Sequence, residues 1–225
     1  MASAVLMEII VRRVVATLCF LPLPLLAFAT PDHAVSGIAI IRELNLARQN
    51  PRLYASFVEQ LRRDYNGRCL FLPGGTRVFL KEGTRSVDDA IRFLRSTSPL
   101  QPLTYSTGMS RGAADHCADQ ANGRFSHTGR DGSDPGARIS RYGTWGVQWG
   151  ENVAYGKFSA RDIVLALIID DGLPARKHRK NIFNTIFNYA GAAYGPHAKF
   201  GSVCTMDFAG AYVDRHEGGA FIAKF

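Results

Sequence analysis

The spacing of apolar residues changes along this chain, and this change most restricts the folds that it can adopt. Near the start, Ile38, Ile41 and Leu44 recur at helical spacing before Asn50-Pro51, where the proline ends or kinks a helix. After Pro174 the pattern favours strands. Because helices come first and strands gather late, without strict alternation of the two, the sequence predicts an α+β fold.

Four further segments carry helical patterns. Ser86 is expected to be the N-cap of a helix that continues to Leu94. Ser159 and Asp162 have the spacing of a capping box before an apolar run, which predicts the start of another helix. The other two helices are expected over 53–61 and over 114–121. The first has an apolar stripe on Leu53, Phe57 and Leu61, which Tyr54 and Val58 widen.

Two glycine-containing stretches predict irregular structure. Residues 66–85 favour a loop or an irregular hairpin, and residues 125–150 favour a loop long enough to carry function. Strands are expected over 189–194 and 203–208, where side chains would alternate between the two faces of a sheet.

The first 29 residues have the features of a secretory signal peptide. Arg12 and Arg13 precede an almost uncharged run that ends in Ala27-Phe28-Ala29, the small-x-small pattern of a cleavage site. This run is too short for a comfortable membrane helix, which needs about 20 apolar residues. We therefore expect a secreted or periplasmic protein that begins near Thr30; a retained N-terminal anchor is the alternative.

The chain is basic, which bears on its partners. Its net charge is +8, and loss of the signal segment with Glu8, Arg12 and Arg13 leaves +7. A basic surface favours anionic cell-envelope partners such as lipid headgroups or acidic polymers. Nucleic acid is not expected, because the protein is exported. The basic run 176–180 is expected to be a solvated loop whose Arg176 or Arg179 could contact an anionic ligand.

Three cysteines remain once Cys19 leaves with the signal segment. In an oxidising compartment, one disulfide and one free thiol are expected, and Cys69 with Cys204 is the preferred pair because Cys117 lies in an Ala-rich helix. The alternative is three thiols without a bond.

Three polar clusters, at residues 126–132, 150–154 and 176–182, each set a His or Glu beside turn residues. Together with Leu44-Asn45-Leu46-Ala47-Arg48 in the first helix, and in this order, they resemble the CAP superfamily. That group includes cysteine-rich secretory proteins, insect venom antigens, plant pathogenesis-related proteins and bacterial relatives, and this chain is most similar to the bacterial type.

The resemblance implies a three-layer α/β/α sandwich with a central antiparallel sheet. The domain would span 36–212, after a short segment at 30–35 and before a C-terminal tail at 213–225. It also implies a cleft that gathers two histidines and two acids. The matching residues are His127, Glu151 and His178, with either Asp170 or Asp171 as the second acid.

Two neutral imidazoles can ligate Zn²⁺, so His127 and His178 predict a weakly held divalent cation. Glu151 could ligate the ion, act as a general base or orient an imidazole. The competing interpretation is a hydrogen-bonded scaffold that pins loops together without chemistry. The resemblance favours a monomeric binding protein for a small, lipid-like or anionic ligand over an enzyme.

An extracytoplasmic hydrolase is the alternative function, through the metal cleft or through Ser110. Residues 108–112 fit the G-x-S-x-G pattern of a nucleophile elbow, and Asp170 or Asp171 followed by His197 would complete a triad. The preceding segment is a poor central strand, so Ser110 is expected near the start of a helix instead.

Overall fold

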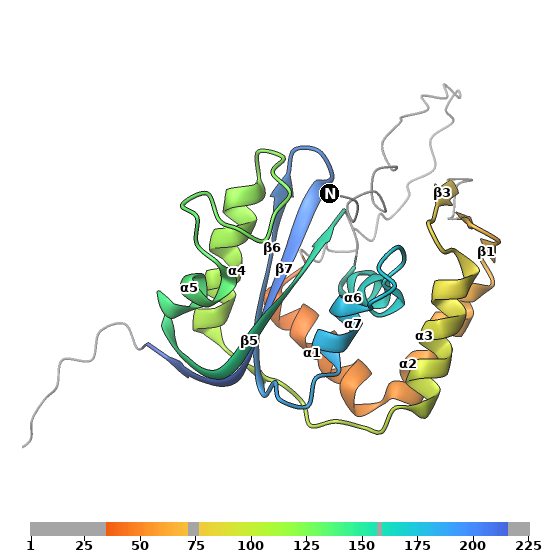
Figure 1. Cartoon of the computed structure of the whole chain (residues 1–225), viewed down its shortest axis with the longest axis horizontal. Coiled ribbons are helices and arrows are strands. Elements are labelled where there is room, and N and C mark those ends of the chain that lie inside the picture. Colours follow the sequence, from red (N-terminus) through yellow and green to blue (C-terminus); the bar gives the residue numbers. More distant parts are fainter. Residues whose placement is uncertain (1–34, 72–76, 157–158, 216–225) are drawn as a thin grey trace, which may run out of the picture.

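The computed structural model describes residues 35–71, 77–156 and 159–215, so the predicted signal peptide lies outside the described residues (Figure 1). The helices are α1 (Gly37–Gln49), α2 (Pro51–Arg62), α3 (Thr84–Ser96), α4 (Thr107–Gln120), α5 (Pro135–Ser140), α6 (Ala160–Ile169) and α7 (Lys177–Ile182). The strands are β1 (Tyr65–Asn66), β2 (Cys69–Phe71), β3 (Arg77–Phe79), β4 (Thr104–Tyr105), β5 (Gly143–Tyr155), β6 (Tyr189–His197) and β7 (Gly201–Asp214).

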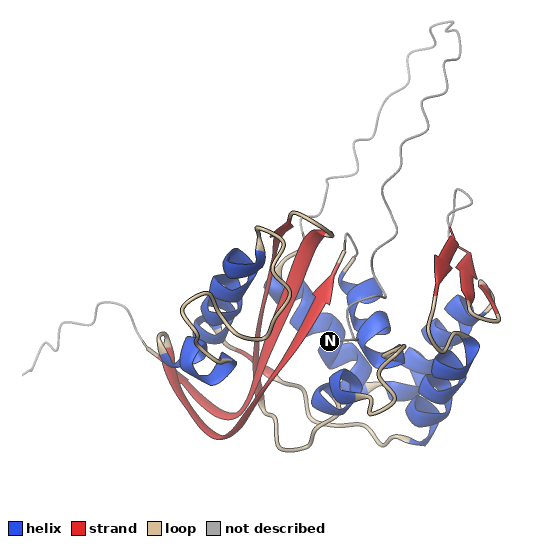
Figure 2. Cartoon of the chain, turned by 45° about the horizontal axis from the view of Figure 1, so that its top comes forward, coloured by secondary structure: helices blue, strands red, loops and turns tan. Residues whose placement is uncertain are grey.

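A four-stranded sheet forms the middle layer of the fold (Figure 2). Its order is β4-β6-β7-β5, and its three long strands are antiparallel, whereas the two-residue β4 joins β6 in parallel. α4 and α5 cover one face, and α1, α6 and α7 lie on the other, with α2 and α3 beyond them (Figure 1). The predicted α+β fold with three layers is confirmed. Because β5 is the last strand in the sheet order, it is an edge strand.

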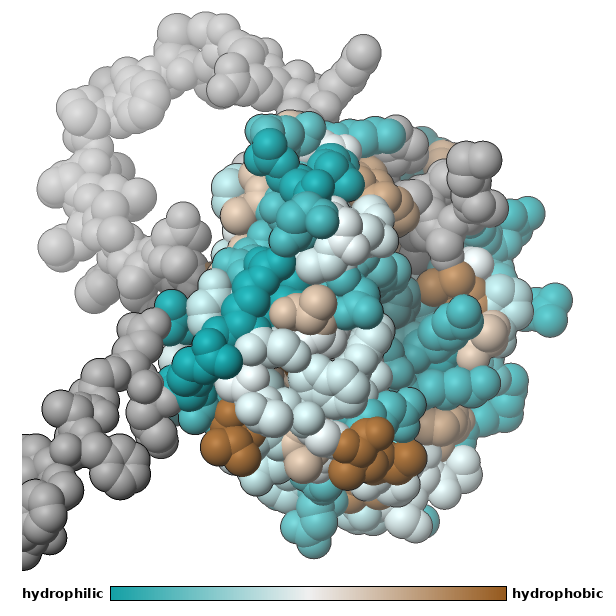
Figure 3. Space-filling view, turned by 60° about the vertical axis from the view of Figure 1, so that its left-hand side comes forward, coloured by the Kyte–Doolittle hydropathy of each residue, from teal (hydrophilic) through white to brown (hydrophobic). Residues whose placement is uncertain are grey.

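Side chains along β7 alternate between the two faces of the sheet. Cys204, Met206 and Phe208 belong to the large core shared with α1 and α6. Val203 packs with Cys117 of α4 on the opposite side, and Asp207 shares that side with Val203 because side chains alternate along a strand. The surface on the α4 and α5 side of the molecule is mainly hydrophilic, with few hydrophobic residues (Figure 3).

Several helix boundaries follow the sequence signals. The Ser36 hydroxyl accepts from the backbone N–H of Ala39 at the start of α1, and Pro51 occupies the first turn of α2. The expected capping box of Ser159 and Asp162 is present at α6. The irregular hairpin expected over 66–85 is formed by β1, β2 and β3. At the other end, β7 continues to Asp214, two residues past the expected end of the domain.

One predicted helix start is wrong, and one predicted apolar face is correct except at one residue. α3 begins at Thr84 after Gly83, whose φ of 62° suits glycine, and Ser86 is buried one turn further on. In α2 the predicted Tyr54 and Val58 are buried, Phe57 and Leu61 are partly buried against the core, and Leu53 is 47% exposed. The helix therefore packs through the predicted apolar face except at Leu53.

The loop predicted over 125–150 is correct only in its first part. Asp134 caps the N-terminus of α5 with Pro135 in its first turn, and β5 begins at Gly143. β5 is irregular between Gly146 and Trp149, where Val147 has a φ of 71°. This bulge interrupts the alternation by which a strand is recognised in a sequence.

The predicted disulfide between Cys69 and Cys204 is not formed: Cys69, Cys117 and Cys204 are all free thiols. Cys69 lies in the small three-stranded sheet, whereas Cys204 is buried in the central one. Burial raises the pKa of the Cys117 thiol to about 11, which makes it unreactive. Among the described residues, none of the helices combines the length and hydrophobicity that crossing a membrane requires.

Candidate functional site

Two histidine–carboxylate pairs stand out among the polar contacts of the domain. The Nδ1 atom of His127 lies 2.6 Å from Oε1 of Glu151. The Nδ1 atom of His178 lies 2.8 Å from Oδ1 of Asp170. Each ring is thus oriented by a carboxylate, as histidines that bind metals commonly are.

The first pair rests on a buried arginine. Glu151, on β5, has a side chain only 2% exposed, and Nη2 of Arg138 donates to its second oxygen. Nη1 of Arg138 also donates to the backbone carbonyl of His127, at 3.1 Å. Nε2 of His116 lies 3.9 Å from Glu151, and burial lowers the pKa of this imidazole. Both Glu151 oxygens therefore have a partner, and one of them orients the His127 ring.

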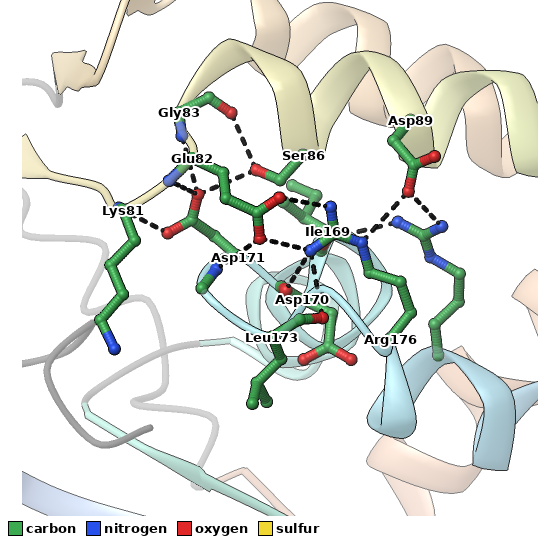
Figure 4. A network of polar contacts seen from close by, with 12 residues as sticks. Lys81, Glu82, Gly83, Ser86, Asp89, Ile169, Asp170, Asp171, Leu173 and Arg176 are labelled. Carbon is green, nitrogen blue, oxygen red and sulfur yellow. Dashed lines mark hydrogen bonds and ion pairs between the residues drawn. The ribbon is translucent and has the colours of Figure 1, made fainter. Parts of the chain in front are cut away.

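The second pair depends on a turn at the end of α6. Asp170 has a left-handed backbone with a φ of 53°, and its Oδ2 also accepts from the backbone N–H of His178, at 3.0 Å. Asp171 points elsewhere: it accepts hydrogen bonds from the Ser86 hydroxyl and from the backbone N–H groups of residues 81–83 (Figure 4). Of the two candidate acids, Asp170 is the one that contacts His178.

Two asparagines connect the pairs. Nδ2 of Asn152 donates to the carbonyl of His178 at 3.1 Å, and Nδ2 of Asn181 donates to the carbonyl of Glu151 at 3.2 Å. Asn181 also donates to Oδ1 of Asn152, at 2.8 Å. The edge strand β5 and helix α7 are thereby held together, and each carries one member of a histidine–carboxylate pair.

The chemistry open to this site is that of two oriented imidazoles. Because each Nδ1 is committed to a carboxylate, Nε2 is the ring nitrogen that a ligand could use. The His127 side chain is 60% exposed and that of His178 is 20% exposed. In the part of the chain that the structure describes, no group of three or more His, Cys, Asp or Glu side chains is arranged to hold a metal ion. Among the described residues, the candidate ligands of a cation are therefore the Nε2 atoms of His127 and His178.

A profile of the CAP family, the cysteine-rich secretory protein family, matches residues 89–208, which span both histidine–carboxylate pairs. The chain belongs to the CAP family.

Two solved structures are similar to this CAP domain. One is an outer surface protein from Borrelia burgdorferi, with 20% identity over 49% of this chain and 78% of that chain, and a TM-score of 0.41. The other is an extracellular protein containing an SCP domain from Bacillus anthracis, with 23% identity over 53% of this chain and 37% of that chain, and a TM-score of 0.40. No curated protein matches the chain.

The basic run of the CAP domain is not a solvated loop, so that prediction is wrong. It forms α7, in which Arg179 is 3% exposed and donates to Asp89 at 2.8 Å. Arg176 makes two hydrogen bonds to Glu82, at 2.6 and 2.7 Å, and these bonds raise its pKa (Figure 4). Both arginines tie α7 to α3 and to the loop before it, and neither is left for an anionic ligand.

The serine triad considered for Ser110 is not formed. Ser110 lies in the first turn of α4, as expected, and its hydroxyl donates to the carbonyl of Ser106 at 2.8 Å. His197 uses Nε2 with the carbonyl of Arg124 and Nδ1 with the backbone N–H groups of Lys199 and Phe200. Both ring nitrogens of His197 are thus bound to backbone groups, so the ring has no nitrogen left to activate a serine.

Sequence reasoning missed three residues around the first pair: His116, Arg138 and Asp207. Arg138 fell in a stretch predicted to be a loop, although Asp134-Pro135 is a recognisable helix start that would have placed it on α5. His116 and Asp207 carry no local signal, since only the packing of α4 and β7 against β5 brings them to Glu151.

Proposed function

We propose that this CAP-domain protein is a secreted or periplasmic binding protein whose two histidine–carboxylate pairs hold a divalent cation such as Zn²⁺ weakly. The observation that carries the proposal is the carboxylate on the Nδ1 of each ring, at 2.6 Å for His127 and 2.8 Å for His178. This arrangement fixes the tautomer in which Nε2 presents a lone pair.

Two imidazoles alone make an open site, because zinc in proteins usually has four ligands. Water or an anionic group of a small or lipid-like ligand would complete the shell, which suits a basic protein with a net charge of +8. Glu151 and Asp170 would hold the two imidazole rings in place through their Nδ1 atoms. The cation would supply a positive charge to which such a ligand could bind.

We expect calorimetric titration of Zn²⁺ into the purified protein to give a dissociation constant in the micromolar range or weaker, no more than about 8 kcal/mol of binding free energy. His127→Ala and His178→Ala should each weaken binding at least tenfold, because each removes one of two ligands. Thr128→Ala is the matched control, since Thr128 is an exposed neighbour of His127. Equal affinities in all four proteins would refute the cation site.

Export is tested separately. We expect N-terminal sequencing of the protein recovered from the periplasm or the medium to begin at or near Thr30, because Ala27-Phe28-Ala29 has the cleavage pattern. Recovery of an intact Met1 on membrane-bound protein would instead support the retained anchor.

A further inference from the structure

Asp207 is a buried aspartate for which the proposed function gives no role. It lies on β7 directly opposite Glu151 of β5, and its exposed fraction is 0%. Neither of its side-chain oxygens has a hydrogen-bond partner among the residues that the structure describes. A buried polar atom without a partner costs free energy, and a buried charge without one costs much more.

The charges around Asp207 are already balanced without it. The buried guanidinium of Arg138 is paired with Glu151, so one positive group faces one negative group. A second carboxylate here would be an uncompensated buried charge, and a water molecule could donate to it but could not neutralise it. The titratable and charged groups that face Asp207 are Glu151 from β5, Arg138 from α5 and Cys117 from α4, with Tyr212 further along β7, while its partner on β6 is Gly191.

We propose that Asp207 is a protonated carboxylic acid whose O–H donates a hydrogen bond to the Glu151 carboxylate and so holds the Glu151–His127 pair in position. Two carboxyl groups that face each other are both acceptors, and one proton between them turns that contact into a hydrogen bond. Burial and the neighbouring Glu151 raise the pKa of Asp207 well above its usual range, against the lowering effect of Arg138. The inference does not depend on cation binding, since it concerns the protein alone.

A proton held in this way makes folding depend on pH. In the unfolded chain an aspartate has a pKa of about 3.9, so above that pH it is ionised, whereas folded Asp207 keeps its proton. Folding then takes up one proton, and stability falls as pH rises from about 3.9 to the raised pKa of the folded state. Within that window the equilibrium constant for unfolding rises up to about tenfold per pH unit.

The variant Asp207→Asn separates a neutral from an ionised aspartate, because the amide is uncharged and can still donate to Glu151. We expect urea unfolding of the purified protein at pH 5, 6, 7 and 8 to show that Asp207→Asn gains stability relative to wild type as pH rises. Asp171→Asn is the matched control at a second buried aspartate, whose carboxylate accepts from three backbone N–H groups and Ser86. Its amide would face those donors with a donor of its own, so it should be less stable than wild type at pH 8.

The opposite result for Asp207→Asn, a deficit that grows with pH, would show that Asp207 is ionised, and a pH-independent difference would also overturn the proposal. A measurement on wild type covers the case in which the variant does not fold. In protein labelled with carbon-13 at aspartate carboxyl groups, we expect the Asp207 carbon at pH 7 to have the chemical shift of a protonated acid. If every aspartate carboxyl carbon has the shift of an ionised group, the proposal is wrong.

Discussion

Replacing Arg138 with leucine will lower the free energy of unfolding by about 3–5 kcal/mol, the cost of leaving one member of a buried ion pair without its partner. Arg138 is 0% exposed, and its guanidinium joins the Glu151 carboxylate to the backbone carbonyls of His127 and Ser133. Without it, Glu151 keeps its charge in a buried place and the His127 loop loses its anchor. Urea unfolding at pH 7 measures the change.

Arg141→Leu is the matched control, at the C-cap residue directly after α5. Its guanidinium also makes ion pairs, to Asp115 at 2.8 Å and to Asp131 at 2.5 Å, but its side chain is 38% exposed. Exposed ion pairs contribute about 0.2–1 kcal/mol, so the loss should be small. Adding Glu151→Gln to Arg138→Leu should recover part of the stability, because it removes the unpaired charge. Equal losses at Arg138 and Arg141 would mean that the buried pair contributes no more than an exposed one.

The parts of the fold that were predictable from sequence are those in which a local pattern and the tertiary structure agree. The capping box at Ser159 marks α6, and the alternation of Cys204, Met206 and Phe208 marks β7 because its two faces meet different cores. The strand β5 was missed because its bulge at Val147 breaks the alternation. α5 was missed because six residues are too few to show helical periodicity.

The residues of the candidate site were likewise predictable from the sequence only in part. His127, Glu151 and His178 stand in recognisable motifs, but a motif does not show which oxygen a ring will meet. Asp170 and Asp171 are adjacent and chemically identical, and at the left-handed turn of Asp170 one carboxylate contacts His178 and the other contacts residues 81–83. That choice depends on the docking of α3 against α6, which is a long-range contact.

Replacing Arg48 with methionine will destabilise the protein by about 3 kcal/mol or more, because it strips donors from several buried carbonyls at about 1–3 kcal/mol each. Arg48 closes the Leu44–Arg48 motif of α1 and is 2% exposed. Its guanidinium donates to four backbone carbonyls: those of Gln101, Ile182, Asn184 and Phe187. Methionine preserves most of the apolar stem, so the loss reports the hydrogen bonds.

The four carbonyls that accept from Arg48 belong to the segment before β4 and to the chain from α7 to β6. Both segments are distant from α1 in the sequence. Arg48 therefore holds in place the end of the helix that carries His178, and Arg48→Met should weaken Zn²⁺ binding as well as folding. Arg42→Met on the same helix is the control, since Arg42 is exposed and its loss should cost no more than about 0.5 kcal/mol. An Arg48→Met protein as stable as Arg42→Met would show that the carbonyls find other donors and that α7 does not need this anchor.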